Sequence, residues 1–184
     1  MLFTRRTAAV ALALFIAFGV LLRLEGRIGW CKYGFGLWTG AHTHCTSQNL
    51  FDPYSLSHVL HGVIFFWLLI PLAPRITLAW RLIMALVVEV GWELFENSAF
   101  VIERYRQNTA SLDYTGDSIV NSSSDLACAL LGFAFAAKFG WKVSAALFIA
   151  FELIQLGLAK DNLTLNVIML LWPIEAIKQW QMAA

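Results

Sequence analysis

Residues 76–101 read ITLAWRLIMALVVEVGWELFENSAFV, an apolar run that is long enough to cross a bilayer and that contains three glutamates. Glu89, Glu93 and Glu96 are spaced i, i+4 and i+7, so a helix places all three on one stripe. A carboxylate at membrane depth is costly unless it is paired, protonated or bound to a metal. The segment therefore predicts a spanning helix with a polar stripe that serves a function.

The composition of the whole chain also indicates an integral membrane protein. Of its 184 residues, 59% are hydrophobic and only 14% are charged, against roughly 25% charged in a soluble domain. The net charge of +1 and the lack of a Lys/Arg cluster argue against a nucleic-acid partner. Membrane lipids are the expected partners, and the sequence identifies no protein partner.

The hydropathy pattern predicts one membrane domain over residues 1–184, an all-α polytopic bundle with five spanning helices. The expected spans cover residues 7–24, 56–73, 76–101, 118–139 and 141–159. The last apolar segment, 163–172, would reach only about 15 Å as a helix. It is either a re-entrant or interfacial piece, or part of a sixth span that continues through Pro173 to Trp180.

Charges at the ends of the spans predict the orientation. No small-residue cleavage site follows the first apolar run, so we expect an uncleaved first helix. The connections between the second and third and the fourth and fifth spans are basic and lack acidic residues, with Arg75, Arg81, Lys138 and Lys142. The positive-inside rule places them in the cytoplasm, in a multi-pass protein of the bacterial inner membrane.

Polar residues cluster at the opposite ends of these spans, which all lie at one membrane face because consecutive spans alternate in direction. Under the predicted orientation this face is periplasmic. The ends carry His58 and His61 in the second span, Glu93 and Glu96 in the third, Asp117 and Asn121 in the fourth, and Asp161 and Asn162 in the fifth.

The start of the fourth span repeats the helical spacing, with Asp117, Asn121 and Asp125 at i, i+4 and i+8. Asp117 or Ser118 can cap this helix, which would explain Asp117 without a catalytic role. Capping does not explain Asp125, two turns deeper. Asp125 and Glu89 should both lie roughly 10 to 12 Å below the entrance of a shared cavity.

Two kinds of chemistry fit such a cavity. Carboxylates of unequal burial can divide general acid and base roles, for example in hydrolysis or transfer on a membrane lipid or lipoprotein. The catalytic candidates are Asp125, Asp117, Glu93 and Asn121. Imidazole and carboxylate groups can also bind a divalent metal such as Zn²⁺ or non-haem iron. The metal-binding candidates are His58, His61, Glu93 and Glu96.

Two alternatives without catalysis remain open. A membrane-depth series of carboxylates and histidines is also typical of a small proton-coupled transporter. Alternatively the chain is a scaffold or partner-binding subunit, in which the carboxylates, Glu152 among them, form ion pairs with Arg104, Arg106 and Lys160.

The sequence leaves the roles of the three cysteines more open than those of the carboxylates. Cys31 and Cys45 share the first loop, where a disulfide is permitted if the loop is periplasmic, and free thiols are the alternative. The same two cysteines could instead bind a metal together with His42 and His44. Cys128, in the middle of a span, is expected to be a small buried residue.

Four segments of the chain resemble one bacterial family of small inner-membrane proteins, domain-of-unknown-function family 2585. These segments are SQNLFDPYSLSHVLHG (47–62), VEVGWELFENS (88–98), DYTGDSIVNSSSDLACALLGF (113–133) and KDNLTLNVIMLLWPIEAIKQW (160–180). The resemblance implies an inner-membrane location and no particular activity. The Asp-x-x-x-Asn pattern at Asp117 and Asn121 is also similar to VanZ-like membrane proteins.

Overall fold

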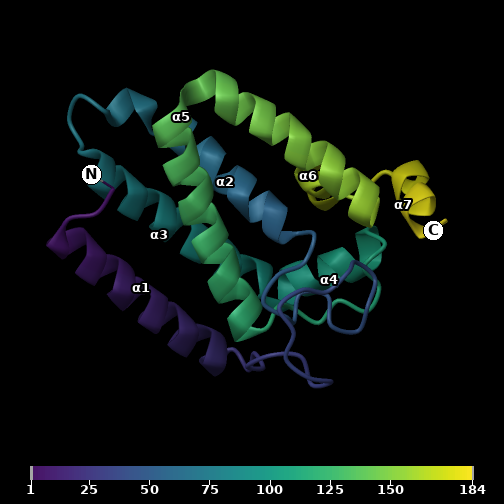
Figure 1. Ribbon diagram of the computed structural model, residues 1–184. Coiled ribbons are helices and arrows are strands. Elements are labelled where there is room, and N and C mark those ends of the chain that lie inside the picture. The colour runs from purple at the N-terminus through teal and green to yellow at the C-terminus, as the bar shows by residue number, and fades with distance from the viewer. Residues whose placement is uncertain (1, 184) are drawn as a thin grey trace.

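A computed structural model describes residues 2–183, and within this range it is helical, with no strand beyond an isolated bridge between Trp38 and Phe51 (Figure 1). The prediction of an all-α chain is confirmed. The helices are α1 Arg5–Leu24, α2 Ser55–Leu68, the 3₁₀ turn η1 Ile70–Leu72, α3 Leu78–Glu96, α4 Ala99–Asn108, α5 Ile119–Ala159, α6 Leu163–Leu171 and α7 Glu175–Met182.

Helix α5 consists of two arms that meet at Gly140 (Figure 1). Gly140 has φ 75° and ψ 178°, a conformation that glycine adopts more readily than other residues, and the chain reverses there. The two arms correspond to the predicted spans 118–139 and 141–159. The break between the arms lies where these two predicted spans adjoin.

Two helices, α1 and the long α5, are apolar and long enough to cross a membrane, and α2 is a shorter apolar helix. Length and composition thus give weak support to a membrane location. They do not by themselves confirm five spans.

Other element boundaries also differ from the predictions. The predicted second span, 56–73, ends as α2 at Leu68 and is followed by the separate turn η1. The predicted third span, 76–101, ends earlier as α3 at Glu96, because Ser98 caps a new helix, α4, by accepting a hydrogen bond from the Val101 backbone N–H. The last apolar segment, for which a sixth span through Pro173 was one of two alternatives, is also broken. Helices α6 and α7 are separated by extended backbone at Ile174, next to Pro173.

The tightest helix pair is α2 against the first arm of α5. A Cβ atom on Gly62 would lie 1.9 Å from the Ala129 carbonyl oxygen, and one on Gly132 would lie 1.9 Å from the Val59 carbonyl oxygen. Only glycine at both positions permits this approach, which is typical of small-residue contacts between apolar helices. The contact holds His58, one turn before Gly62, against the start of α5.

Helix α1 lies along α3 and closes the other side of the bundle. Phe18 and Leu22 of α1 are fully buried against Ile83 and Leu86 of α3 and Leu126 of α5. This apolar layer fixes the rotation of α3 and turns its glutamate stripe toward α2 and α5.

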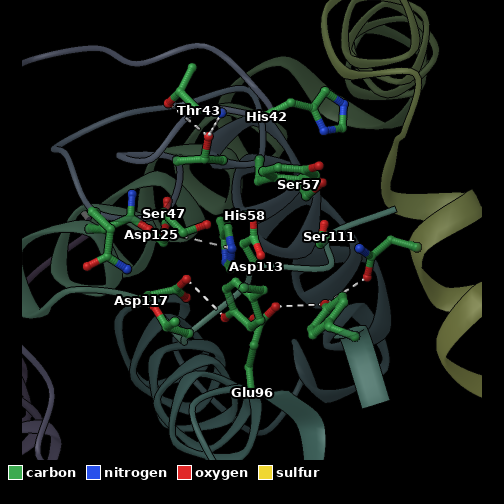
Figure 2. A pocket seen from close by; sticks show the side chains of 18 of the residues that line it. His42, Thr43, Ser47, Ser57, His58, Glu96, Ser111, Asp113, Asp117 and Asp125 are labelled. Carbon is green, nitrogen blue, oxygen red and sulfur yellow. Dashed lines mark hydrogen bonds and ion pairs between the residues drawn. The ribbon is translucent and has the colours of Figure 1, made fainter. Parts of the chain in front are cut away.

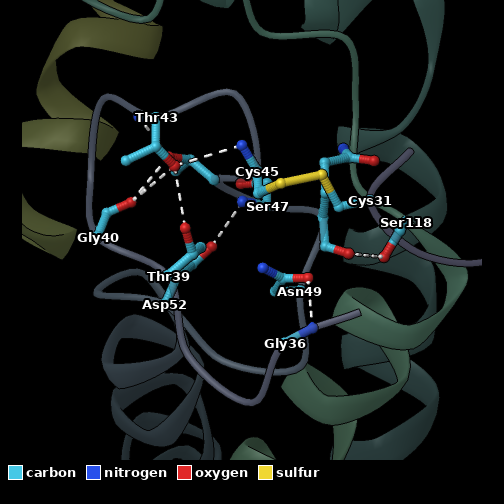
Figure 3. The surroundings of a disulfide bond; sticks show 12 residues. Cys31, Gly36, Thr39, Gly40, Thr43, Cys45, Ser47, Asn49, Asp52 and Ser118 are labelled. Atoms are coloured by element: carbon cyan, nitrogen blue, oxygen red, sulfur yellow. Dashed lines mark hydrogen bonds between the residues drawn. A yellow bond between two sulfur atoms is a disulfide. The ribbon is translucent and has the colours of Figure 1, made fainter. Parts of the chain in front are cut away.

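The first loop, residues 25–54, folds over the start of α5. Cys31 and Cys45 form a disulfide within it (Figure 3). The disulfide was one of the predicted alternatives, and it removes the thiols that the Cys/His metal site would need. The loop carbonyls of Ser47, Ile28 and Gly29 accept hydrogen bonds from the first backbone N–H groups of α5 and its cap, which have no partner within the helix.

Candidate functional site

Polar side chains of the three helices α2, α3 and α5 converge in the space between them. His58 Nδ1 lies 2.6 Å from Oε1 of Glu89 and 3.2 Å from Oε1 of Glu93. On the other side of the ring, His58 Nε2 lies 3.9 Å from Oδ2 of Asp125 (Figure 2). These four side chains are buried, and both glutamates are fully inaccessible to solvent. The convergence expected from helical spacing is present in the structure.

His61 extends the cluster by one helical turn. Its Nδ1 lies 3.1 Å from both oxygens of Glu89, so the Glu89 carboxylate is shared between the two imidazoles. The His61 ring also contacts the indole of Trp92, with centroids 5.9 Å apart in an edge-to-face arrangement. Glu89 is therefore held on both sides, and it orients His58 rather than pointing into open space.

In the described part of the chain, three carboxylate oxygens of Glu93 and Asp125 have no hydrogen-bond partner, although Oε1 of Glu93 lies within ion-pair distance of His58. Both oxygens of Glu93 and Oδ1 of Asp125 are buried without a hydrogen-bond partner among the described residues. Since such groups are rare and costly, their presence indicates a site for a cation, a proton or a polar ligand.

Two groups of side chains are close enough to hold a metal ion. One contains His58, His61 and Glu89, and the other contains His58, Glu93 and Asp125, with the ligand atoms of each group within 4.8 Å of one another. Since Glu89 already binds both imidazoles, the second group is the one with free donors. The predicted ligands His58 and Glu93 belong to it, and Asp125 joins them.

Glu96, another predicted metal ligand, lies elsewhere in the site. Its Oε1 accepts a hydrogen bond of 2.8 Å from the Tyr105 hydroxyl, which also lies 2.9 Å from Oδ1 of Asn166. This arrangement connects α3 to α4 and α6. The sequence interpretation had no basis for this partner, because it placed Tyr105 in a loop rather than on a helix that faces α3.

Asp117 and Asn121 lie at the start of α5 and take part in holding the surrounding loops. Asp117 accepts a hydrogen bond of 3.0 Å from the Tyr114 hydroxyl, and its N–H donates to Oδ1 of Asn97 at 2.7 Å. The Asn121 side-chain amide donates to the Asn49 carbonyl at 2.9 Å. The cap itself is Ser118, whose hydroxyl accepts from the Asn121 backbone N–H.

Burial shifts the pKa of two carboxyl groups at this end of the molecule. It raises the pKa of Asp117 well above the ordinary value, and the negative charge of Glu96 adds to the shift. Burial likewise raises the pKa of Asp52, although three backbone N–H groups donate to this carboxylate and oppose the shift. Asp52 precedes α2, and its hydrogen bonds to the backbone of Ser47, Tyr54 and Ser55 hold the loop before His58.

A cavity of about 1320 Å³ lies beside this cluster. His58, Asp125, Asp117 and Glu96 line it, and Figure 2 shows their side chains around the space. The first loop and residues 110–115 form further walls. The site is therefore a chamber with acidic and imidazole groups on its inner wall.

The expected counter-charges do not neutralise these carboxylates. Arg104 and Arg106 donate to the main-chain carbonyls of Leu170 and Tyr114, and Lys160 donates to that of Ala183. Within residues 2–183, each ion pair shorter than 4.0 Å involves His58 or His61. Glu152 lies apart from the cluster and accepts from the Thr164 backbone N–H. A closed network of Arg and Lys ion pairs is therefore absent from the described residues.

Comparison with known proteins identifies relatives over nearly the whole chain. The family described as Protein of unknown function (DUF2585) matches residues 6–183. A UPF0314 protein of Brucella anthropi is 49% identical over 175 residues, which cover 95% of this chain and 89% of the relative. A UPF0314 protein of Paracoccus denitrificans is 46% identical over 187 residues, covering 99% and 96%. No solved structure matches, and the similarity to VanZ-like proteins stays a prediction.

Proposed function

The chain belongs to the DUF2585 family of proteins of unknown function, and we propose that it is a multi-pass inner-membrane protein that binds a divalent metal ion and uses it in hydrolysis or transfer on a membrane-embedded substrate. His58, Glu93 and Asp125 are the proposed metal ligands. The single observation that carries the proposal is the free Nε2 of His58, which faces Asp125 while Nδ1 is held by Glu89.

This arrangement matches a recurring feature of metal sites. A histidine that binds a metal through one ring nitrogen usually donates its other N–H to a carboxylate, which fixes the ring orientation. Glu89 supplies this carboxylate at 2.6 Å, and His61 holds Glu89 in turn. The unsatisfied oxygens of Glu93 and Asp125 complete a set of one nitrogen and two carboxylate donors. Imidazole and carboxylate ligands suit Zn²⁺, Mn²⁺ or Fe²⁺.

The chamber supports a catalytic role for this site. A metal with three protein ligands retains an open position for water or substrate, and it lowers the pKa of a bound water toward neutrality. Asp117 lines the same cavity and has a raised pKa, which favours the protonated carboxyl and suits a group that donates a proton. Asp117 is accordingly the proposed general acid.

The outer surface supports a membrane location with more than two spans. Large apolar side chains are strongly exposed along α1 and along both arms of α5, as in Leu12 (63%), Ile16 (61%), Leu131 (66%) and Leu153 (64%). A water-soluble protein rarely exposes apolar surface over this extent. Both arms of α5, together with α1, α2 with η1, and α3, are the five proposed spans.

The function is tested in cells that lack this protein and carry either the wild-type gene or the Asp125→Asn variant. Lipids and lipoproteins are compared by mass spectrometry, with Glu175→Gln at an exposed position of α7 as the control. The proposal expects a lipid or lipoprotein species to accumulate with Asp125→Asn and not with Glu175→Gln, at equal protein levels. Identical profiles for wild type and Asp125→Asn would count against a catalytic role.

A further inference from the structure

The cavity also has an apolar part of its lining, called the apolar flank. It consists of Phe65 of α2, Val88 and Trp92 of α3, and Leu163 and Val167 of α6. The metal-binding chemistry proposed above uses none of these residues. Their placement raises the question of what the apolar part of the chamber holds.

Val88 belongs to the cavity wall and to the outer surface at the same time. Helix α3 presents an exposed apolar face that includes Met84 (36%), Val87 (50%) and Val88 (53%). Val88 lies at the edge of this face, and of these three residues it is the one that also lines the cavity. The cavity therefore meets the apolar exterior of the bundle at Val88.

Helix α6 also has a residue that is exposed on the outer surface and lines the cavity. Val167 is 42% exposed and lines the cavity, whereas Leu171, one turn further, is 75% exposed and does not line it. The buried side of α6 packs on α4, where Leu170 contacts Val101 and Tyr105. Helix α6 packs mainly against α4, so its contact with α3 is sparse.

Trp92 and His61 lie between the edge at Val88 and the polar cluster. Trp92 lies one turn after Val88 and contacts the ring of His61, with centroids 5.9 Å apart. The next group inward is Glu89, which joins His61 to His58. A long molecule that entered between α3 and α6 would therefore reach the proposed metal ligands with its head while its tail stayed on the apolar flank.

We propose that the opening between α3 and α6 admits the hydrocarbon chain of a membrane lipid, so that the substrate of the site is an amphiphile that enters sideways from the bilayer. The proposal rests on the membrane location proposed above. A lipid fits because the cavity is apolar where it joins the exposed face of α3 and polar at its inner end. A ligand that enters through the loops from water would need no apolar edge at Val88.

The test uses the full chain in nanodiscs of phosphatidylethanolamine and phosphatidylglycerol that contain a phosphatidylglycerol with a diazirine in one acyl chain. After illumination, labelled peptides are mapped by mass spectrometry. Labelling is expected on the interior residues Phe65 and Leu163, and Val88→Trp, which fills the opening, is expected to reduce it to the level of an unilluminated sample. Val87→Trp is the matched control, because Val87 is equally exposed but does not line the cavity.

A second pair of variants tests the same opening independently, in case Val88→Trp does not fold. Val167→Trp is expected to abolish interior labelling, and Leu171→Trp on the same helix is expected to preserve it. The proposal is overturned if interior labelling is absent in the wild type, or if it persists in both Val88→Trp and Val167→Trp. The same labelling of the His58→Ala variant, which lacks one proposed metal ligand, distinguishes this inference from the metal site. If this variant keeps its interior labelling, the opening is supported even if the wild-type protein binds no metal.

Discussion

The Nδ1 atom of His58 lies 2.6 Å from Oε1 of Glu89, and this contact between α2 and α3 determines which nitrogen of the imidazole is left free. With the Nδ1 proton donated to Glu89, a neutral His58 would carry its lone pair on Nε2, which faces Asp125. A neutral imidazole in this tautomer is a metal ligand.

Glu89→Gln should weaken metal binding without removing a ligand. Glutamine fills the same volume but has no charge to orient the two imidazoles, so we expect the affinity for Zn²⁺ to fall about 10- to 100-fold, as for other carboxylates behind metal-bound histidines. Competition titration with a fluorescent chelator in detergent measures the change. Glu175→Gln at the exposed start of α7 is the control. An affinity equal to the wild type would show that Glu89 does not position His58.

Gly62→Ala should destabilise the bundle, since the added Cβ would lie 1.9 Å from the Ala129 carbonyl oxygen. The helices would have to separate, and overpacking of this kind costs about 1 to 3 kcal/mol or more. Gly157→Ala is the control, because a Cβ at Gly157 meets no atom within 4 Å. Alanine favours a helix over glycine by up to about 1 kcal/mol, so the control should be neutral or stabilising. Thermal unfolding in one detergent compares the two, and equal unfolding temperatures would contradict the close packing of α2 and α5.

Replacement of Cys31 and Cys45 by serine should loosen the wall that the first loop forms over the cavity. The disulfide closes a loop with a sequence separation of 14, and a crosslink of this length contributes about 3 kcal/mol. We expect faster proteolysis within residues 25–54 and a lower unfolding temperature. Cys128→Ala serves as the control for the loss of a buried cysteine outside the loop. A wild-type protein that reacts with three equivalents of alkylating reagent without reduction would show that the bond is not formed.

Asp161 should make stability depend on pH between about 4 and 6. Burial raises the pKa of this carboxyl to about 6 from an ordinary value of 3.8. Because the folded-state pKa is the higher one, the contribution of Asp161 is fully present below pH 3.8 and is lost as the pH rises through about 6. The loss is at most about 3 kcal/mol, which corresponds to the difference between these two pKa values.

Asp161→Asn removes this titration and keeps a side-chain oxygen for the Asn162 backbone N–H. We therefore expect the variant to gain stability relative to the wild type as the pH rises from 4 to 7. Unfolding curves for both proteins at each pH give the difference in their free energies of unfolding. The contributions of the other titrating groups are the same in both proteins and cancel in this difference. A constant difference over this range would contradict the raised pKa.

Helical periodicity was sufficient to predict which faces meet. Glu89 and Glu93 lie on the stripe that the i, i+4 spacing defines, Asp125 lies deeper on its helix than Asp117, and His58 faces both helices. The turn at Gly140 and the loop with Cys31 and Cys45 also follow from local sequence. These features depend on residues that are close in the chain.

The exact partners could not be predicted in the same way. Whether Glu89 or Glu96 contacts a histidine depends on the depth and rotation of α3 against α2, which the packing of Gly62 and the apolar layer under α1 determine. Glu96 instead meets Tyr105, because the chain breaks at Ser98 and returns as α4. Asp52 was missed for a similar reason: it precedes its helix, and its hydrogen bonds are visible only once the loop is folded.

All of the chemistry proposed for this site depends on one divalent metal ion held by His58, Glu93 and Asp125. The most direct test of this metal site is the metal content of the protein, purified in detergent without chelators and analysed by inductively coupled plasma mass spectrometry. We predict one equivalent of a single transition metal or zinc per wild-type chain, and a loss of most of it in Glu93→Gln and in Asp125→Asn, with Glu175→Gln unchanged. A folded wild-type protein that contains no metal and takes up none on dialysis against Zn²⁺, Mn²⁺ or Fe²⁺ would contradict the existence of this site.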